Sequence, residues 1–374
     1  MSTSPNGVVR PRVVVVGGGY AGITVAKDLD GDADVVLVEP RDTFVHHIGA
    51  LRALVDPGFA PSIFMPLDRL LEHGRVIRDR AVRVDPEVVT LSSGERLDAD
   101  YVILATGSRY PYPAKPETEV AEHALARLRE GNAALADASR ALIVGAGPVG
   151  LELAGEIRAA FPGVGVTVAD LAADILEGPY DPALREELHA QLEGLGVELL
   201  LGSPFVALPD TDPGRFGAFT VATEAGTTVS GDVWFRCFGV TPVSDYLGEG
   251  LAAARTAEGF IAVGPDLRVA GQERVFAIGD VSTADRNMAG IARVQAGVVA
   301  GNVRTLAAGA GELGAYQPFP PAIAVPLGPA GGAGQFPGQE GIVGPETVAD
   351  VKGRDLMVGG LAEVLGRESA PTSS

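Results

Sequence analysis

The sequence of 374 residues contains a single cysteine, Cys237. One chain can therefore form no internal disulfide and no Cys-x-x-Cys pair, which excludes a thiol–disulfide mechanism. Basic residues are also few, since 29 Lys and Arg face 48 Asp and Glu, a formal net charge of −19. A field of this sign repels polyanions, so we expect no nucleic acid partner and disfavour strongly anionic docking proteins.

Long apolar runs are missing as well. No run approaches the about 20 residues of a membrane span. The start, MSTSPNGVVRP, lacks the apolar core of a secretory signal, and its second residue is Ser2 rather than the glycine that myristoylation requires. No group of Cys and His has ligand spacing, so we expect no metal. We expect a folded, cytoplasmic protein whose membrane contact is at most weak and peripheral, at the inner face of the membrane.

Glycine, by contrast, is abundant, with 50 residues. The β-branched run Val13–Val16 is typical of a buried parallel strand, and the sequence GGGYAG that follows it opens a helix. Glycines in this pattern allow a tight turn and let a pyrophosphate approach the backbone at a helix N-terminus. Glu39, which ends the next strand 22 residues after Gly17, has the spacing of a ribose-binding acid. We predict a dinucleotide site made of Gly17, Gly18, Gly19, Tyr20, Ala21, Gly22 and Glu39.

The same pattern returns in the middle of the chain. The strand ALIV leads into GAGPVG, and a second strand ends in Asp170, 25 residues after Gly145. We assign Gly145, Gly147, Pro148, Gly150 and Asp170 to a second dinucleotide site. One such site can hold FAD and the other a nicotinamide, which brings a hydride donor to a flavin.

With these motifs the chain resembles the pyridine-nucleotide flavoprotein oxidoreductases that have two dinucleotide-binding domains. YVILATGS (Tyr101–Ser108) and RVFAIGDVS (Arg274–Ser282) are further family motifs, and the resemblance covers roughly residues 11–305. FVHHIGALRALVDPGF and VKGRDLMV are similar to the ferroptosis suppressor and apoptosis-inducing-factor-like branch, which is related to type II NADH:quinone oxidoreductases. The resemblance implies an α/β fold with two Rossmann-like domains and a small C-terminal α+β domain.

The resemblance also implies further cofactor contacts. Asp280 matches the aspartate that binds the FAD ribityl and pyrophosphate region. The helix GIARVQAGVVAGNV would direct its N-terminus at the flavin, where the positive end of the helix dipole stabilises reduced, anionic flavin. Besides Asp280, we assign to the cofactor sites Arg41, Val82, Ala105, Thr106, Gly107, Gly239, Gly279 and Gln295.

The expected domains follow from these motifs. The FAD domain comprises residues 11–112 and 241–308, the NAD(P)H domain 113–240, and the small domain 309–366, with flexible tails at 1–10 and 367–374. YPYPAKPETE is rich in proline and predicts an extended crossover rather than a helix. DPALREELHAQLEGLG predicts an amphipathic helix. In the C-terminal domain, FPPAIAVPLGPAGGAGQFPG is too rich in Pro and Gly for a helix and predicts short strands and loops.

Candidate catalytic residues lie in FVHHIGALRALV. In disulfide-reducing family members this helix carries the redox cysteines, which are absent here. Arg52 stands among core-facing residues and so needs a charged partner. The resemblance offers Glu152, which projects toward the flavin–nicotinamide junction; a flavin phosphate or a surface ion pair are the alternatives.

The neighbouring positions leave alternatives open. His46 and His47 either cap the helix start or hydrogen-bond backbone, or they deliver protons to a reduced quinone or contact the isoalloxazine ring. Glu156 either lies near the nicotinamide ribose, as in the family, or is a solvent-facing helix charge. His73, His123 and His189 are expected at the surface, and Cys237 in the core.

The sequence therefore predicts an FAD-dependent enzyme that takes hydride from NADH onto flavin N5 and passes two electrons to a quinone or another small-molecule acceptor. NADPH is expected to serve less well, because Asp170 would repel its 2′-phosphate. The alternatives are an NADH:ferredoxin reductase and a redox-sensing protein like apoptosis-inducing factor. Monomer and homodimer both remain open.

Overall fold

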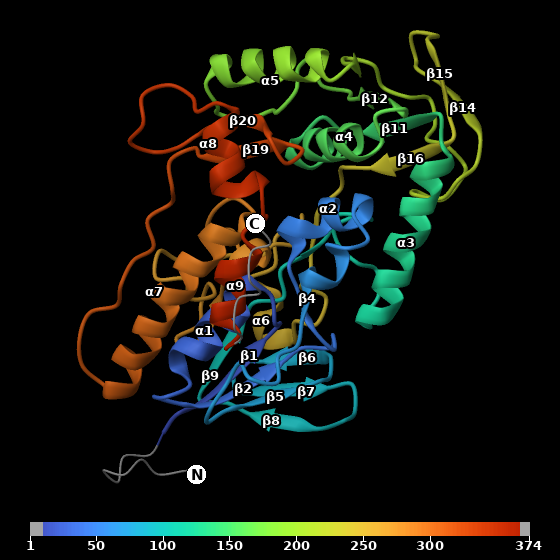
Figure 1. Cartoon of the computed structure of the whole chain (residues 1–374). Helices are drawn as coiled ribbons and strands as arrows, with labels where there is room; N and C mark the ends of the chain where they lie inside the picture. The colour runs from blue at the N-terminus through green and yellow to red at the C-terminus, as the bar shows by residue number, and fades with distance from the viewer. Residues whose placement is uncertain (1–9, 367–374) are drawn as a thin grey trace.

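The computed structural model describes residues 10–366, apart from the side chain of Glu363, and is shown in Figure 1. The predicted tails lie outside these residues except for Arg10. Two parallel sheets, one above the other in Figure 1, form the cores of two domains.

The first domain is built on a five-stranded parallel sheet in the order β18-β9-β1-β2-β5. Its strands are β1 (Arg12–Val16), β2 (Asp34–Val38), β5 (Arg75–Ile77), β9 (Tyr101–Leu104) and β18 (Val275–Ala277). Side chains alternate between the two faces of a strand, so Val13 and Val15 pack beneath helices α1 (Tyr20–Leu29) and α7 (Ala289–Ala308). Val14 and Val16 face the antiparallel layer formed by β6 (Ala81–Asp85), β7 (Val88–Leu91) and β8 (Arg96–Asp98), with α6 (Glu249–Ala252).

The second domain repeats the plan with a four-stranded parallel sheet in the order β13-β12-β11-β16. The strands are β11 (Arg140–Val144), β12 (Gly165–Ala169), β13 (Val197–Leu200) and β16 (Val233–Arg236). One face carries α4 (Pro148–Ala160) and α5 (Pro182–Gly194), and the other the hairpin of β14 (Phe219–Ala222) and β15 (Thr228–Gly231). The predicted amphipathic helix is α5, whose N-cap Asp181 accepts a hydrogen bond from Ala183 N.

The two domains are joined by extended crossovers. The outgoing strand β10 (Ser108–Arg109) pairs antiparallel with the returning strand β17 (Thr241–Pro242). Residues 110–120 form no helix or strand, as the proline-rich sequence predicts, and contain a cis Tyr112–Pro113 bond. Helix α3 (Ala121–Asp137) then leads into the second domain. The domain boundaries themselves remain predictions.

A short helix of the first domain reaches across this junction. It is α2 (Ala50–Val55), preceded by β3 (Phe44–Val45) and the 3-10 turn η1 (His47–Gly49), and followed by η2 (Ala60–Ile63) and β4 (Phe64–Met65). Leu51 and Leu54 of α2 share a buried cluster with Leu153 of α4. The first domain therefore packs directly onto the helix that follows the second glycine motif.

The C-terminal domain consists of short elements, and its Pro- and Gly-rich segment forms two short strands, as expected. They are the hairpin β19 (Ile323–Leu327) and β20 (Gly331–Gln335), α8 (Pro345–Val348), the π-helical turn η4 (Ala349–Gly353) and α9 (Val358–Val364). Figure 1 shows the hairpin beside α4 and α5 and α9 beside α1. The expected α/β fold with two Rossmann-like domains and a small α+β domain is confirmed.

Candidate active site at the junction of the domains

The first glycine motif forms the expected strand–turn–helix unit. Gly17 has a φ of +103°, and a Cβ there would lie 2.6 Å from Ala105 O, so no other residue fits. Glu39 is buried, and its Oε2 accepts a hydrogen bond from Gly18 N at 2.6 Å while Oε1 accepts one from Arg41 N at 2.9 Å. The acid therefore lies at the glycine loop, where the spacing places it.

The second glycine motif has the same geometry. Gly145 has a φ of +117°, and a Cβ there would lie 2.5 Å from Cys237 O. Asp170 Oδ2 accepts from Ala146 N at 2.6 Å and Oδ1 from Ala172 N at 2.9 Å. The carboxylate thus points at the loop rather than into solvent, and Pro148 stands at the start of α4 as a residue without a free N–H should.

The residues of the two later family motifs also meet. Asp280, in the turn η3 (Gly279–Val281), accepts hydrogen bonds from Ser108 Oγ at 2.6 Å and from Lys115 Nζ at 3.2 Å. Gln295 of α7 is buried and accepts from Gly279 N at 2.7 Å. Gln295 therefore holds the loop that carries Asp280. Lys115, which the sequence did not single out, extends from the crossover to the same Asp280 carboxylate.

The remaining predicted contacts surround these loops. Thr106 Oγ1 donates to Val243 O at 2.6 Å, which ties the outgoing strand to the returning one. Gly107 and Gly239 have φ values of +66° and +93°. Val82 is 47% exposed at a bulge in β6, and its contact with a cofactor stays a prediction.

The two histidines have different environments. His46 is buried, with Nε2 2.6 Å from Leu356 O and Nδ1 3.0 Å from Tyr20 Oη. Since a carbonyl only accepts, Nε2 carries the proton and Nδ1 accepts from Tyr20. His47 Nδ1 is buried without a hydrogen-bond partner among the described residues. Burial, reinforced by Lys115 and Arg41, holds the pKa of His47 well below its usual value.

The predicted ion pair between Arg52 and Glu152 is wrong. Arg52 is 8% exposed and its guanidinium forms a two-pronged pair with Glu156, with Nε 2.5 Å from Oε2 and Nη2 2.7 Å from Oε1. Glu156 is 3% exposed, so its alternative as a solvent-facing charge is also wrong, while its place near a nicotinamide ribose stays a prediction. The reason is that the Arg52 side chain of α2 meets α4 one turn beyond Glu152, at Glu156.

Glu152 pairs instead with a cation from the C-terminal domain. Lys352 Nζ lies 2.6 Å from Glu152 Oε1 and 3.4 Å from Ala324 O. Burial raises the pKa of Glu152, and Lys352 opposes this shift. The VKGRDLMV segment, which carries part of the family resemblance, could have drawn attention to Lys352. Nothing in the sequence indicates that Lys352 pairs with Glu152, 200 residues away.

Both glycine loops have room for a dinucleotide. A Cβ built on Gly19 or Gly147, each the N-cap of its helix, meets nothing within 4 Å. Near the first loop, Arg41 Nε, Thr43 Oγ1 and His47 Nδ1 are buried without partners among the described residues. Open backbone at two helix N-termini and unsatisfied donors beside one of them fit a bound FAD and a nicotinamide dinucleotide.

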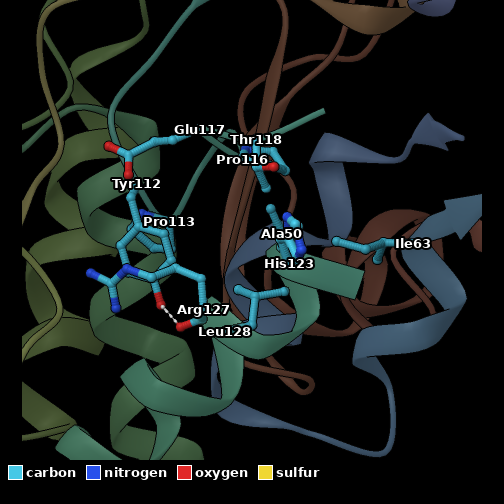
Figure 2. Close-up of a pocket in the computed structure, with 11 residues that line it drawn as sticks. Ala50, Ile63, Tyr112, Pro113, Pro116, Glu117, Thr118, His123, Arg127 and Leu128 are labelled. Carbon is cyan, nitrogen blue, oxygen red and sulfur yellow. Dashed lines mark hydrogen bonds between the residues drawn. The ribbon is translucent and has the colours of Figure 1, made fainter. Parts of the chain in front are cut away.

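A separate cavity of about 270 Å³ lies behind the crossover, between α2, η2 and α3 (Figure 2). Figure 2 shows Tyr112 and Arg127 on one side and Ile63 on the other. His123, exposed as predicted, contributes to its lining. None of the predicted cofactor residues lines this cavity, which distinguishes it from the dinucleotide sites.

The other singled-out residues behave as expected. His73 is exposed, and His189 is half-exposed, with Nε2 2.7 Å from Asp174 Oδ1. Cys237 is buried, and burial raises the pKa of its thiol to about 12, so it is no reactive thiolate. Within residues 10–366 no group of three metal-ligating side chains occurs, and no helix is long and apolar enough to cross a membrane.

Comparison with known proteins identifies the family. Residues 11–301 match the family model described as pyridine nucleotide-disulphide oxidoreductase. Ferroptosis suppressor protein 1 of Taeniopygia guttata is 32% identical over 93% of this chain and 94% of its own. The human protein of that name is 30% identical over the same shares, and apoptosis-inducing factor homolog B of Dictyostelium discoideum is 27% identical over 87% and 90%.

Solved structures share the fold. The sulfide:quinone oxidoreductase of Aquifex aeolicus matches with a TM-score of 0.76 and 17% identity, over 97% of this chain and 93% of that one. NDH2 of Plasmodium falciparum, in complex with NADH, matches with a TM-score of 0.72 and 10% identity, over 91% and 94%. The chain belongs to the pyridine nucleotide-disulphide oxidoreductases, in the branch of ferroptosis suppressor protein 1 and the apoptosis-inducing factor homologues, and is an oxidoreductase that binds a flavin and a pyridine nucleotide.

Proposed function

We propose that this protein is an FAD-dependent NADH:quinone oxidoreductase. The observation that carries the proposal is the presence of two dinucleotide loops, with the mostly buried pair of Glu152 and Lys352 on the helix after the second loop, in a chain whose one thiol is buried and unreactive. When bound, the flavin accepts a hydride from reduced nicotinamide and gives two electrons to an acceptor. Without a cysteine pair, those electrons pass directly to the acceptor.

The chain's own residues bind and orient the two dinucleotides. The loops after β1 and β11 offer backbone N–H groups to two pyrophosphates, and Glu39 and Asp170 hold the loops in shape. Asp280, with Ser108 and Lys115, lies where the family binds the ribityl chain. Arg41, Gly107, Gly239 and Val82 remain proposed contacts.

Lys352 and Glu152 are the proposed catalytic pair. Lys352 Nζ carries a proton and a positive charge to a buried point beside α4, and Glu152 fixes its position. A cation held there favours any negative charge that develops at the junction. His47, whose Nδ1 is buried and unpartnered among the described residues, is the proposed proton carrier, while His46 has both ring nitrogens engaged and orients the turn.

An acceptor panel tests the proposal. Steady-state NADH oxidation should be fast with menadione and with a short-chain ubiquinone, and slow with ferredoxin or oxygen. Preference for ferredoxin would replace the proposal with a ferredoxin reductase, and no turnover with any acceptor would favour a redox-sensing role like that of apoptosis-inducing factor.

NADH is the proposed donor because Asp170 follows β12 and its carboxylate lies at the second glycine loop. No basic residue that could neutralise a 2′-phosphate occurs in the next three positions, Leu171, Ala172 and Ala173. A carboxylate and a phosphate about 4 Å apart repel by roughly 1 to 4 kcal/mol, which is about 10- to 1000-fold in affinity. The parent enzyme should therefore have a higher kcat/KM for NADH than for NADPH, and Asp170→Ala should reduce that ratio. Equal use of both donors by the parent, or no gain for NADPH in the variant, would contradict this assignment.

A further inference from the structure

We propose that Arg52 and Glu156 are positioning residues that fix the peptide carrying Lys352 at the domain junction. The role of Lys352 in hydride transfer rests on the proposed function; the positioning itself does not. Arg52 comes from the first domain, Glu156 from the second and Lys352 from the third, so the arrangement joins all three.

The geometry of Arg52 carries the first step. After Nε and Nη2 bind Glu156, Nη2 also donates to Gly353 O at 2.9 Å and Nη1 to Arg354 O at 3.3 Å. These carbonyls belong to the two residues that follow Lys352. Only the planar fork of an arginine can bind a carboxylate with one edge and two carbonyls with the other, since a lysine has one nitrogen. Arg52 thus holds the backbone of this peptide while Glu152 holds the Lys352 side chain.

The backbone of this peptide needs such support. Lys352 lies in the π-helical turn η4, and Leu356 and Met357 have φ values of 53° and 63°, a left-handed conformation that costs energy in residues other than glycine. Arg52 binds the start of this stretch, and His46 Nε2 donates to Leu356 O near its end. The shape is therefore imposed from the first domain.

The charges lead to the same conclusion. Glu152 and Glu156 lie one turn apart on α4, and among the described residues each carboxylate pairs with a cation from another domain. Without Arg52, Glu156 would be an unpaired buried charge close enough to compete with Glu152 for Lys352. Glu156 therefore keeps Arg52 in place, and Arg52 keeps Glu156 from drawing Lys352 away.

The test uses a double variant, Arg52→Met/Glu156→Met, because replacing a whole buried pair with apolar side chains leaves no unpaired charge. In the flavin-loaded protein, hydrogen exchange at the amides of Arg354 and Leu356 should become about tenfold faster or more, while exchange in β11 stays unchanged. Unchanged protection at Arg354 and Leu356 would overturn the proposal, whether or not the enzyme uses quinones.

Two further variants separate positioning from charge and from general damage. Arg52→Lys keeps the charge but loses the fork, and it should lose the same protection; parent-like exchange in this variant would overturn the proposal. In the parent background, Lys352→Met should slow anaerobic flavin reduction by NADH. In the double-variant background, where Lys352 is already displaced, the same substitution should slow this reaction by less than about threefold. Equal, multiplicative effects in both backgrounds would show that Arg52 and Glu156 do not position Lys352.

Discussion

At the scale of single residues, each dinucleotide loop pairs an acidic side chain with a small residue, and the sizes of the two side chains complement each other. In the first loop Glu39 faces Gly18, and a Cβ on Gly18 would lie 2.9 Å from Glu39 Cγ. In the second loop the acid is Asp170, one methylene shorter, and the facing residue, Ala146, does carry a Cβ. A longer acid with glycine and a shorter acid with alanine therefore build the same loop.

This match predicts a rescue by double substitution. Gly18→Ala should weaken flavin binding by about tenfold, because overpacking of about 1 to 3 kcal/mol displaces Glu39. Gly18→Ala combined with Glu39→Asp should recover most of the affinity, since it copies the second loop. Flavin dissociation constants of the purified apoprotein measure both, with Ala146→Gly in the second loop, which leaves Gly18 and Glu39 unchanged, as the control. A double variant weaker than Gly18→Ala alone would contradict the size match.

The buried histidines predict how stability depends on pH. Burial lowers the pKa of His46, an effect that the backbone of Leu356 and Asp355 oppose and Lys352 reinforces. A pKa below the unfolded value of about 6.5 means that stability is complete above that pH and is lost as pH falls from 6.5 toward the folded pKa, by up to about 1.4 kcal/mol per pH unit.

His46→Gln keeps a donor and an acceptor but does not titrate. Between pH 6.5 and 5.5 the variant should lose less unfolding free energy than the parent, and the difference between the two proteins at pH 8 gives the non-titrating part of the change. Thermal unfolding of the flavin-loaded proteins at the three pH values measures this. Parallel curves would show that His46 does not titrate differently in the folded and unfolded states.

At the scale of elements, the hairpin of β19 and β20 depends on a helical glycine. A Cβ on Gly155 of α4 would lie 2.4 Å from Leu327 Cα and 2.6 Å from Gly328 N, both backbone atoms that cannot move aside cheaply. Gln191 of α5 fixes the other strand, accepting from Gly332 N at 2.6 Å and donating to Gly332 O at 3.0 Å. The C-terminal domain thus docks closely on both helices of the second domain.

Gly155→Ala should therefore destabilise the protein by about 1 to 3 kcal/mol although alanine favours helices. The matched control is Gly301→Ala in α7, an exposed helical position where a Cβ meets nothing within 4 Å, which should stabilise by about 0.5 to 1 kcal/mol. Thermal unfolding midpoints should move in opposite directions. A stabilising Gly155→Ala would mean that the hairpin does not pack against α4 as described.

Local sequence patterns predict most elements, because strand–turn–helix units, the cap of α5 and the helix α7 depend on neighbours in the chain. They also place Glu39 and Asp170, whereas the family resemblance places Asp280. Local patterns cannot choose between Glu152 and Glu156 as the partner of Arg52, because both side chains lie on the face of α4 that meets the other domains. The point at which α2 packs on α4 determines which of the two pairs with Arg52. Lys115 and Lys352 were missed for a related reason: their partners are 165 and 200 residues away.

At the scale of the whole molecule, the C-terminal domain adds apolar side chains to the cores of both other domains. Val325 and Leu327 of its hairpin belong to the buried cluster of the second domain, and Leu361 and Leu365, at the other end, belong to that of the first. The domain therefore spans the junction and carries Lys352 to it. Lys352 and Glu152 come from two different domains, which is why no single segment predicts this pair.

We propose that electrons pass from nicotinamide to flavin and then directly to a small acceptor. Anaerobic double-mixing stopped flow follows it through the flavin absorbance, first with NADH and then with menadione, in the parent and in Cys237→Ser. The account predicts rapid loss of the flavin absorbance with NADH and rapid return with menadione, at the same rates in both proteins. Flavin that NADH does not reduce, or a return that requires Cys237, would contradict it.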